Sequence, residues 1–181
     1  MSAPRLRRLA ADYKRLQEEF YDHPRVHIEP IGPQPPEQYR VTYDVTSAIW
    51  DAERSLPVRA YRHVVLISLP ADYPRHEPVC VIESGHFHPN IGEKYGVADY
   101  ICINDIWSPT QELWEIVAKV GDILQFKIRN PHSPLDAVAA RWTMDNENLL
   151  PLSDEPMLQS DIPIEIGDAQ DPMQVKRDST Y

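Results

Sequence analysis

Several things are scarce in this chain of 181 residues: cysteine, glycine, basic charge and long apolar runs. Two cysteines cannot build a disulfide scaffold, and their spacing is not that of a metal-binding pair. No run of about 18 apolar residues is present, so the sequence predicts no membrane-spanning helix. The first twenty residues lack a continuous apolar stretch, which argues against a secretion signal. We therefore expect a cytoplasmic protein in a reducing setting.

Basic residues are outnumbered by acidic ones, 18 against 28, which argues against a general nucleic-acid binder. The excess is concentrated at the C-terminal end, because residues 147–181 hold eight acids and two bases. Large aromatic residues are also absent from 147–180. Such a segment supplies little core, so we expect one domain over 1–146 and a flexible or peripheral acidic tail over 147–181. Within this tail, residues 161–168 alternate isoleucine with acids, which suits either strand addition to a partner or a solubilising tail.

Hydrophobic periodicity predicts the order of the elements. The first twenty residues place apolar side chains three and four positions apart, which is typical of an amphipathic helix. The basic residues of this helix largely avoid its apolar stripe. Four runs rich in β-branched and aromatic residues follow and predict an antiparallel meander, over 26–31, 39–49, 59–69 and 78–83.

The stretch 84–109 has no clean period and contains three glycines, which indicates a functional loop. A helix is then expected to begin at Ser108-Pro109, because serine is a good N-cap and proline a good first helical residue. That helix should end near Arg129. A second helix is expected after Pro134, with an apolar face made by Leu135, Val138, Ala139 and Trp142.

Cys102 is the main candidate for chemistry. The chain has no glycine-rich loop for phosphate and no paired-carboxylate signature, which leaves a cysteine nucleophile and its polar surroundings. The alternative is an ordinary buried cysteine, which is the interpretation that we favour for Cys80 within its apolar strand. A zinc site made by His86, His88 and Cys102 would have poor ligand spacing.

Five short motifs follow one another along the chain, and together they are specific although each alone is weak. They are Tyr73-Pro74 with Glu77-Pro78, His88-Pro89-Asn90, Ile101-Cys102-Ile103, Trp107-Ser108-Pro109, and Asn130-Pro131-His132-Ser133-Pro134-Leu135. In this order they resemble the thioester-carrying ubiquitin-conjugating enzyme superfamily over residues 4–146. The resemblance implies that superfamily's mixed α/β (α+β) fold: an N-terminal helix, a four-stranded antiparallel meander, an active-site loop and C-terminal helices.

The resemblance also implies a reaction. Cys102 would accept a ubiquitin-like modifier from an ATP-dependent activating enzyme, as a thioester, and pass it to an amine of a protein target. Asn90 would support the oxyanion. Asn104 and Ser133 would orient and desolvate the incoming lysine, although both residues equally suit an ordinary cap or turn.

The remaining roles implied by the resemblance are supporting ones. His88 and Pro89 would hold the turn that presents Asn90, and Tyr100 would support the active site. No metal or cofactor is implied. The N-terminal helix would meet the activating enzyme, with partner-binding residues Arg5, Arg8, Arg15 and Pro109, and a merely solvated basic face is an equal alternative.

Three features depart from the family pattern. Asn90 lies 12 residues before Cys102, which is longer than the usual spacing, while Trp107 follows the cysteine sooner than usual. Arg75 stands where many relatives have an aromatic residue that docks RING-type ligases, so the need for a ligase stays open. Such divergence resembles conjugating enzymes encoded in bacterial operons that serve antiphage defence.

Two other functions remain open at this point. The first is a non-catalytic variant of the same fold that binds ubiquitin-like proteins, although such variants usually lack the cysteine. The second is a cysteine hydrolase, which would need a histidine placed against Cys102.

Overall fold

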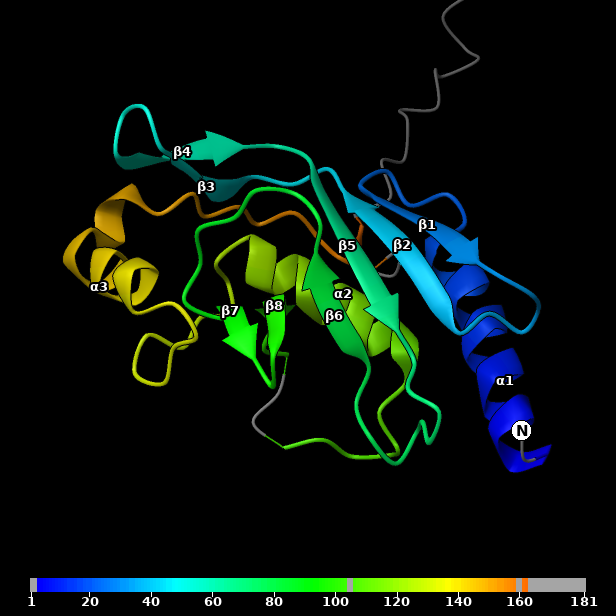
Figure 1. Ribbon diagram of the computed structural model, residues 1–181. Helices are drawn as coiled ribbons and strands as arrows, with labels where there is room; N and C mark the ends of the chain where they lie inside the picture. Colours follow the sequence, from blue (N-terminus) through cyan, green and yellow to red (C-terminus); the bar gives the residue numbers. More distant parts are fainter. Residues whose placement is uncertain (1–2, 104–105, 159–160, 163–181) are drawn as a thin grey trace, which may run out of the picture.

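A computed structural model describes residues 3–103, 106–158 and 161–162 of the chain (Figure 1). An N-terminal helix is followed by eight strands, two further helices and a 3₁₀ turn within these residues. The elements are α1 (Ala3–Phe20), β1 (Val26–Ile31), β2 (Gln38–Tyr43), β3 (Ser47–Asp51), β4 (Leu56–Ala60), β5 (His63–Ser68), β6 (Val79–Ile82), β7 (Ile91–Lys94), β8 (Val97–Ile101), α2 (Leu113–Leu124), α3 (Ala137–Asp145) and the 3₁₀ turn Glu147–Leu149.

The expected antiparallel meander is present as β1, β2, β5 and β6, which are neighbours in one sheet. Two of the predicted strands are each divided in two, because the chain leaves the sheet after β2 and returns at β5. The excursion forms a separate hairpin, β3–β4 (Figure 1). An ion pair between Asp44 and Arg62, 2.9 Å long, joins the points of exit and return.

The stretch 84–109, which we expected to be an irregular loop, contains a second hairpin. Its strands β7 and β8 extend the sheet to six strands in the order β1-β2-β5-β6-β8-β7. Tyr95 and Gly96 both have positive φ, 55° and 74°, as the two central residues of a type I′ hairpin turn require. The extra residues between Asn90 and Cys102 are therefore folded back on themselves as a hairpin.

α2 lies against one face of the sheet and its apolar side forms the core with the meander (Figure 1). It begins at Leu113 rather than at Ser108, and the Glu115 carboxylate accepts a hydrogen bond from the Glu112 N–H before it. Ser108 instead stabilises a turn, since its carbonyl accepts from the Gln111 N–H. The helix ends at Leu124, earlier than expected, because Phe126 adopts a positive φ of 60° that no α-helix continues.

α1 forms as predicted, and most of its apolar stripe, including Phe20, faces the core, although that face is turned somewhat from the expected one. Leu9 and Leu16 are buried, whereas Leu6 is exposed and Arg5 lies inward. The Arg5 guanidinium donates to the Glu37 carboxylate and to the Pro70 carbonyl. The expectation that Arg5 belongs to an exposed basic face is therefore wrong, because a partner elsewhere in the fold neutralises it inside.

α3 begins at Ala137, slightly later than expected, with Asp136 as its N-cap accepting hydrogen bonds from the Val138 and Ala139 N–H groups. Val138 is 65% exposed, so its predicted burial is wrong, whereas Ala139 is buried as predicted and Ala140 lies beside it on the inner face. α3 lies at the opposite end of the molecule from α1 (Figure 1). None of the helices in the described ranges is long and apolar enough to cross a membrane.

Residues 147–158 differ from the peripheral tail that composition predicted. They run back from α3 toward the start of β1 (Figure 1), and Leu150 and Met157 are buried in the core. Glu155 forms an ion pair with Arg25 at 2.6 Å, and its N–H donates to the Gln125 side chain. Twelve residues of the predicted tail are thus part of the folded body, and most of the 161–168 motif lies outside the described residues.

Candidate active site

Asn90 and Cys102 face each other at the open end of the β7–β8 hairpin. The Cys102 N–H donates to the Asn90 carbonyl at 2.8 Å, and the Asn90 side-chain amide donates to the Cys102 carbonyl at 3.4 Å. Ile91 pairs with Ile101 inside the hairpin, so the residues one step outside this pair must be neighbours. The long spacing between the two motif residues is therefore an excursion that returns the cysteine to the asparagine.

Asn90 is held by hydrogen bonds to both its side chain and its backbone. Its side-chain oxygen accepts a hydrogen bond from the Asn130 N–H at 2.8 Å, and its own N–H donates to His88 Nδ1 at 3.0 Å. Complete burial, with smaller contributions from His86 and Arg129, lowers the pKa of His88 to about 3. The imidazole is therefore neutral at ordinary pH and keeps the lone pair that this hydrogen bond needs.

The turn before α3 is clamped onto the hairpin, which brings Ser133 to the same place. The Leu135 N–H donates to the Pro89 carbonyl at 2.8 Å, and the Ser133 N–H donates to the Asn130 side chain at 3.2 Å. Gly92 of β7 allows the close approach, since a Cβ there would lie 2.9 Å from the Leu135 carbonyl oxygen.

An open cavity of about 510 Å³ collects three of the four residues that we predicted as catalytic, Cys102, Asn90 and Ser133. The fourth, Asn104, lies outside the described residues. Three cations also line the cavity, whereas no carboxylate does so among the residues that the structure describes. The lining is completed by Lys94, Lys119, Arg129, Asn130, Ile103, Ile128, Pro134 and Leu135.

Lys94 is the residue of this site that the sequence argument missed. Its Nζ donates to Cys102 Sγ at 3.5 Å and lies over the rings of Tyr95 and Tyr100, 5.1 and 5.2 Å from their centroids. The over-long spacing between Asn90 and Cys102 was the available signal, because Lys94 belongs to the extra residues. No local pattern showed that the hairpin would turn this amine toward the thiol.

Tyr100, predicted to support the site, has its hydroxyl fixed rather than facing solvent. The hydroxyl donates to the Glu77 carboxylate at 2.8 Å. Burial, followed by that hydrogen bond, raises the pKa of Tyr100 well above its ordinary value. The hydroxyl therefore stays protonated, and the ring forms a fixed platform beneath the Lys94 amine.

The two cysteines have different surroundings. Cys80 is fully buried in β6, and burial raises the pKa of its thiol well above the ordinary value, whereas Cys102 is only partly buried.

The zinc alternative finds no support in the described ranges, where no three potential ligand side chains come together. The hydrolase alternative needs a histidine beside Cys102, but the ring of His88 packs on Phe126 with centroids 4.3 Å apart.

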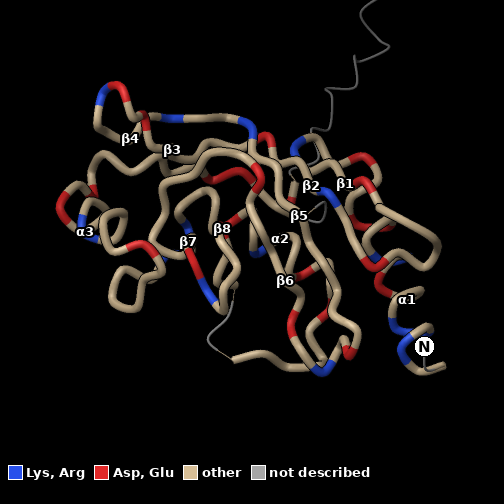
Figure 2. Tube along the Cα trace, viewed as in Figure 1, with Lys and Arg blue, Asp and Glu red and all other residues tan. Residues whose placement is uncertain are grey.

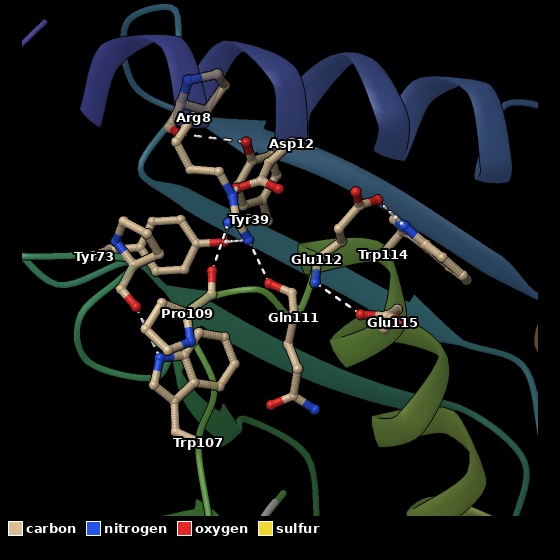
Figure 3. A network of polar contacts seen from close by, with 12 residues as sticks. Arg8, Asp12, Tyr39, Tyr73, Trp107, Pro109, Gln111, Glu112, Trp114 and Glu115 are labelled. Carbon is tan, nitrogen blue, oxygen red and sulfur yellow. Dashed lines mark hydrogen bonds and ion pairs between the residues drawn. The ribbon is translucent and has the colours of Figure 1, made fainter. Parts of the chain in front are cut away.

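The predicted partner-binding residues lie on and beside α1, where Arg8 and Pro109 belong to an internal polar network (Figure 3). Arg8 donates to the Asp12 carboxylate and the Pro109 carbonyl, both at 2.8 Å, and to the Gln111 carbonyl. The Tyr73 hydroxyl donates to the same Asp12 carboxylate at 2.7 Å. Arg8 thus joins α1 to the segment before α2, while the Pro109 side chain remains exposed.

The surface of α1 is not purely basic. Arg15 is exposed and lies over the Trp114 ring, 5.6 Å from its centroid, but it also pairs with Glu18 and Glu19. Figure 2 shows acidic as well as basic residues along this helix. Of the four predicted contact residues, Arg15 and Pro109 are the two whose side chains face solvent.

Comparison with known proteins agrees with this geometry. The family model for ubiquitin-conjugating enzymes matches residues 57–150. Ubiquitin-conjugating enzyme E2 1 of Caenorhabditis elegans is 28% identical over 146 residues, covering 81% of this chain and 69% of the relative. Ubiquitin-conjugating enzyme E2 2 of Candida glabrata is 28% identical over 151 residues, covering 82% of this chain and 81% of the relative.

A solved structure gives the same fold. The E2 domain of a Toxoplasma gondii ubiquitin conjugating enzyme superposes with a TM-score of 0.51 at 22% identity, covering 81% of this chain and 88% of the other. The implied fold class is thereby confirmed, with the β3–β4 and β7–β8 hairpins added to the expected meander. The order of the motifs, the fold and the family match point the same way, and this chain belongs to the ubiquitin-conjugating enzyme family.

Proposed function

We propose that this protein carries a ubiquitin-like modifier as a thioester on Cys102 and transfers it to an amine of a protein target. The observation that supports the proposal best is the single open cavity that Cys102 shares with Asn90 and Ser133. A thioester needs access for two large partners, and a partly buried thiol at the rim of an open cavity offers it. A fully buried thiol such as that of Cys80 does not.

Asn90 is the proposed oxyanion donor. Its amide reaches the Cys102 carbonyl at 3.4 Å, which is long for a hydrogen bond and costs little to release. When an amine attacks the thioester, negative charge develops on the acyl oxygen beside this amide. Because the Asn130 N–H holds the oxygen of the same side chain, the amide needs little reorganisation at that moment, which favours strong stabilisation of the transition state.

The cations of the cavity suit the incoming amine. Only the neutral form of a lysine is a nucleophile, and neighbouring positive charge favours that form over the ammonium. Lys94, Lys119 and Arg129 all line the cavity. Ser133, with Asn104, is the proposed group that orients the amine by hydrogen bonding.

The activating enzyme is the proposed partner of the α1 side. Arg15 and Pro109 are its contacts in this proposal, because their side chains are exposed. Arg8 contributes indirectly, by fixing the Pro109 backbone against α1. We also propose that the catalytic unit extends to Leu158, since residues 150–158 complete its core, and that the acidic tail begins beyond it.

The experiment incubates the full chain with activating enzyme, ATP and modifier and then separates products with and without thiol reductant. The parent should give an adduct that reductant removes. Cys102→Ala should give none, whereas Cys80→Ala, the matched control in the sheet, should keep it. Loss of the adduct in Cys80→Ala with retention in Cys102→Ala would overturn the assignment. The absence of any adduct would favour a binding module of the same fold.

A further inference from the structure

Lys94 holds an amine beside the proposed acceptor thiol in the resting structure. Its Nζ lies 3.5 Å from Cys102 Sγ, and the side chain is partly buried. The rings of Tyr95 and Tyr100 flank this amine, and the Tyr100 ring is in turn fixed through Glu77. Among the residues that the structure describes, no carboxylate forms an ion pair with Lys94 that would hold it away from the sulfur.

The backbone fixes this approach as well. Lys94 is the last residue of β7 and pairs with Val97 across the tight turn, with a register irregularity between Gly92 and Lys94. The side chain therefore starts from a short hairpin instead of a long mobile loop. Little conformational freedom has to be lost before the amine meets the sulfur.

A thioester places its carbonyl carbon one bond from the sulfur. An amine held 3.5 Å from Sγ is then already close to the separation of about 3–3.5 Å from which reacting groups combine. Intramolecular reactions between groups so placed proceed at very high effective concentrations. The Lys94 amine is therefore the first nucleophile that an acyl group on Cys102 meets.

We propose that Lys94 is a self-modification site, to which the acyl group of a Cys102 thioester passes in the absence of a target. The inference rests on the proposed function. The neutral amine attacks the carbonyl carbon, the C–N bond forms and the C–S bond breaks. The nitrogen loses one proton and the departing thiolate takes one up. The products are an isopeptide on Lys94 and a free Cys102 thiol, and no oxidant or other reactant is consumed.

This transfer has a consequence for the cavity. A modifier linked to Lys94 through its C-terminus occupies the space that Cys102, Asn90 and Ser133 share, so a second modifier cannot enter. Self-modification would thus block an enzyme that is loaded while no target is present. A target amine prevents the block only when it reaches the thioester faster than Lys94 does.

The test uses a chemical probe that needs neither the modifier nor the activating enzyme. The full chain is incubated with the mercaptoethanesulfonate thioester of N-acetylglycine, and acylated residues are mapped by mass spectrometry before and after hydroxylamine, which removes thioesters but not amides. The parent should carry a hydroxylamine-resistant acyl group on Lys94. Lys94→Arg should instead accumulate the labile group on Cys102.

Two further variants complete the test. Cys102→Ala should reduce acylation of Lys94 at least about tenfold, because the intramolecular route is lost. Lys14→Arg, which replaces an exposed lysine of α1 outside the cavity, should behave like the parent. Equal acylation of Lys94 in the parent and in Cys102→Ala would overturn the proposal, and so would a stable thioester on Cys102 of the parent. Failure of the proposed function would appear separately, as the missing adduct with activating enzyme and modifier.

Discussion

Two polar regions of this molecule, the Arg8–Asp12 network and the cavity around Cys102, differ in how their charged groups are arranged. In the network between α1 and α2, the cation Arg8 meets a carboxylate and two backbone carbonyls, and Asp12 is buried (Figure 3). In the cavity around Cys102, three cations line the walls and Lys94 contacts the thiol, while no carboxylate appears in the described lining, although Arg129 pairs with Glu147 at 3.5 Å. The first region is electrostatically complete and so contributes stability. The second keeps a partly buried thiol at an open cavity, which is the access that the proposed transfer needs.

The largest loss of stability is expected when the network between α1 and α2 loses Asp12, the carboxylate at its centre. Asp12→Ala leaves the Arg8 guanidinium and the Tyr73 hydroxyl without their buried acceptor, which should cost about 3 kcal/mol of the free energy of unfolding. Urea unfolding measures this loss. Burial, the largest cause, raises the pKa of Tyr73 above its ordinary value and remains in the variant, so the hydroxyl cannot compensate by ionising.

The control for this variant is Glu18→Ala, which removes only exposed ion pairs and should change stability by less than about 1 kcal/mol. Alkylation of Cys102 by iodoacetamide should proceed at the parent's rate in both variants under native conditions. A changed alkylation rate in folded Asp12→Ala would show that the two regions are coupled, against the comparison drawn above.

A smaller effect on stability but a clear one on transfer is expected at Asn90. Asn90→Ala should slow discharge of the Cys102 thioester to free lysine about 100-fold, because the oxyanion loses its fixed donor. It should also cost about 1 kcal/mol of stability, because the Asn130 N–H loses its acceptor. Single-turnover discharge and urea unfolding measure the two effects.

Asn90→Asp separates these two roles of the side chain. It keeps an oxygen for the Asn130 N–H but lacks the amide donor, so stability should recover while discharge stays slow. Recovery of both would show that Asn90 acts only by holding the turn. In that case Asn90 would contribute only to stability, as the Arg8 network on the α1 side does.

The third effect depends on pH. The folded-state pKa of His88 is about 3, below the ordinary 6.5, so the unfolded chain takes up a proton more readily as pH falls through 6.5. The contribution of His88 is therefore fully present at pH 7 and should fall by about 2 kcal/mol at pH 5. His63 and His23, whose pKa values burial also lowers, act in the same direction.

A His88→Asn variant isolates this contribution, because asparagine can still accept from the Asn90 N–H but does not titrate. Unfolding free energies of parent and variant, measured at pH 7 and pH 5, should converge by about 2 kcal/mol at the lower pH. If the difference in unfolding free energy between parent and variant were the same at both pH values, the pH dependence could not be assigned to His88.

The sequence was informative wherever local pattern decides structure. Alternation and periodicity identified α1, the four strands of the meander and the existence of two later helices. The motif order predicted one site for Asn90, Cys102 and Ser133 through the resemblance to the family, and the three residues do line one cavity. Pattern failed at Ser108, where good capping chemistry serves an isolated turn instead of a helix start.

What the sequence could not show depends on contacts between distant residues. Arg5 is buried because Glu37, 32 positions away, receives its guanidinium, and no periodicity reveals such a pair. The β7–β8 hairpin escaped notice because charges and glycines conceal its alternation, so the position of Lys94 beside Cys102 was also hidden. The burial of Leu150 and Met157 was masked by the acidic composition around them.

The packing of Met157 on α2 has a consequence for how this chain can change over evolutionary time. Gly121 lies directly beneath the Met157 side chain, and a Cβ at position 121 would lie 2.2 Å from the Met157 sulfur in its present position. A larger residue at 121 therefore requires the Met157 side chain to move or to be replaced by a shorter one. Descendants of this sequence should exchange the two together, and a lineage that lost the segment after α3 would free position 121 to vary.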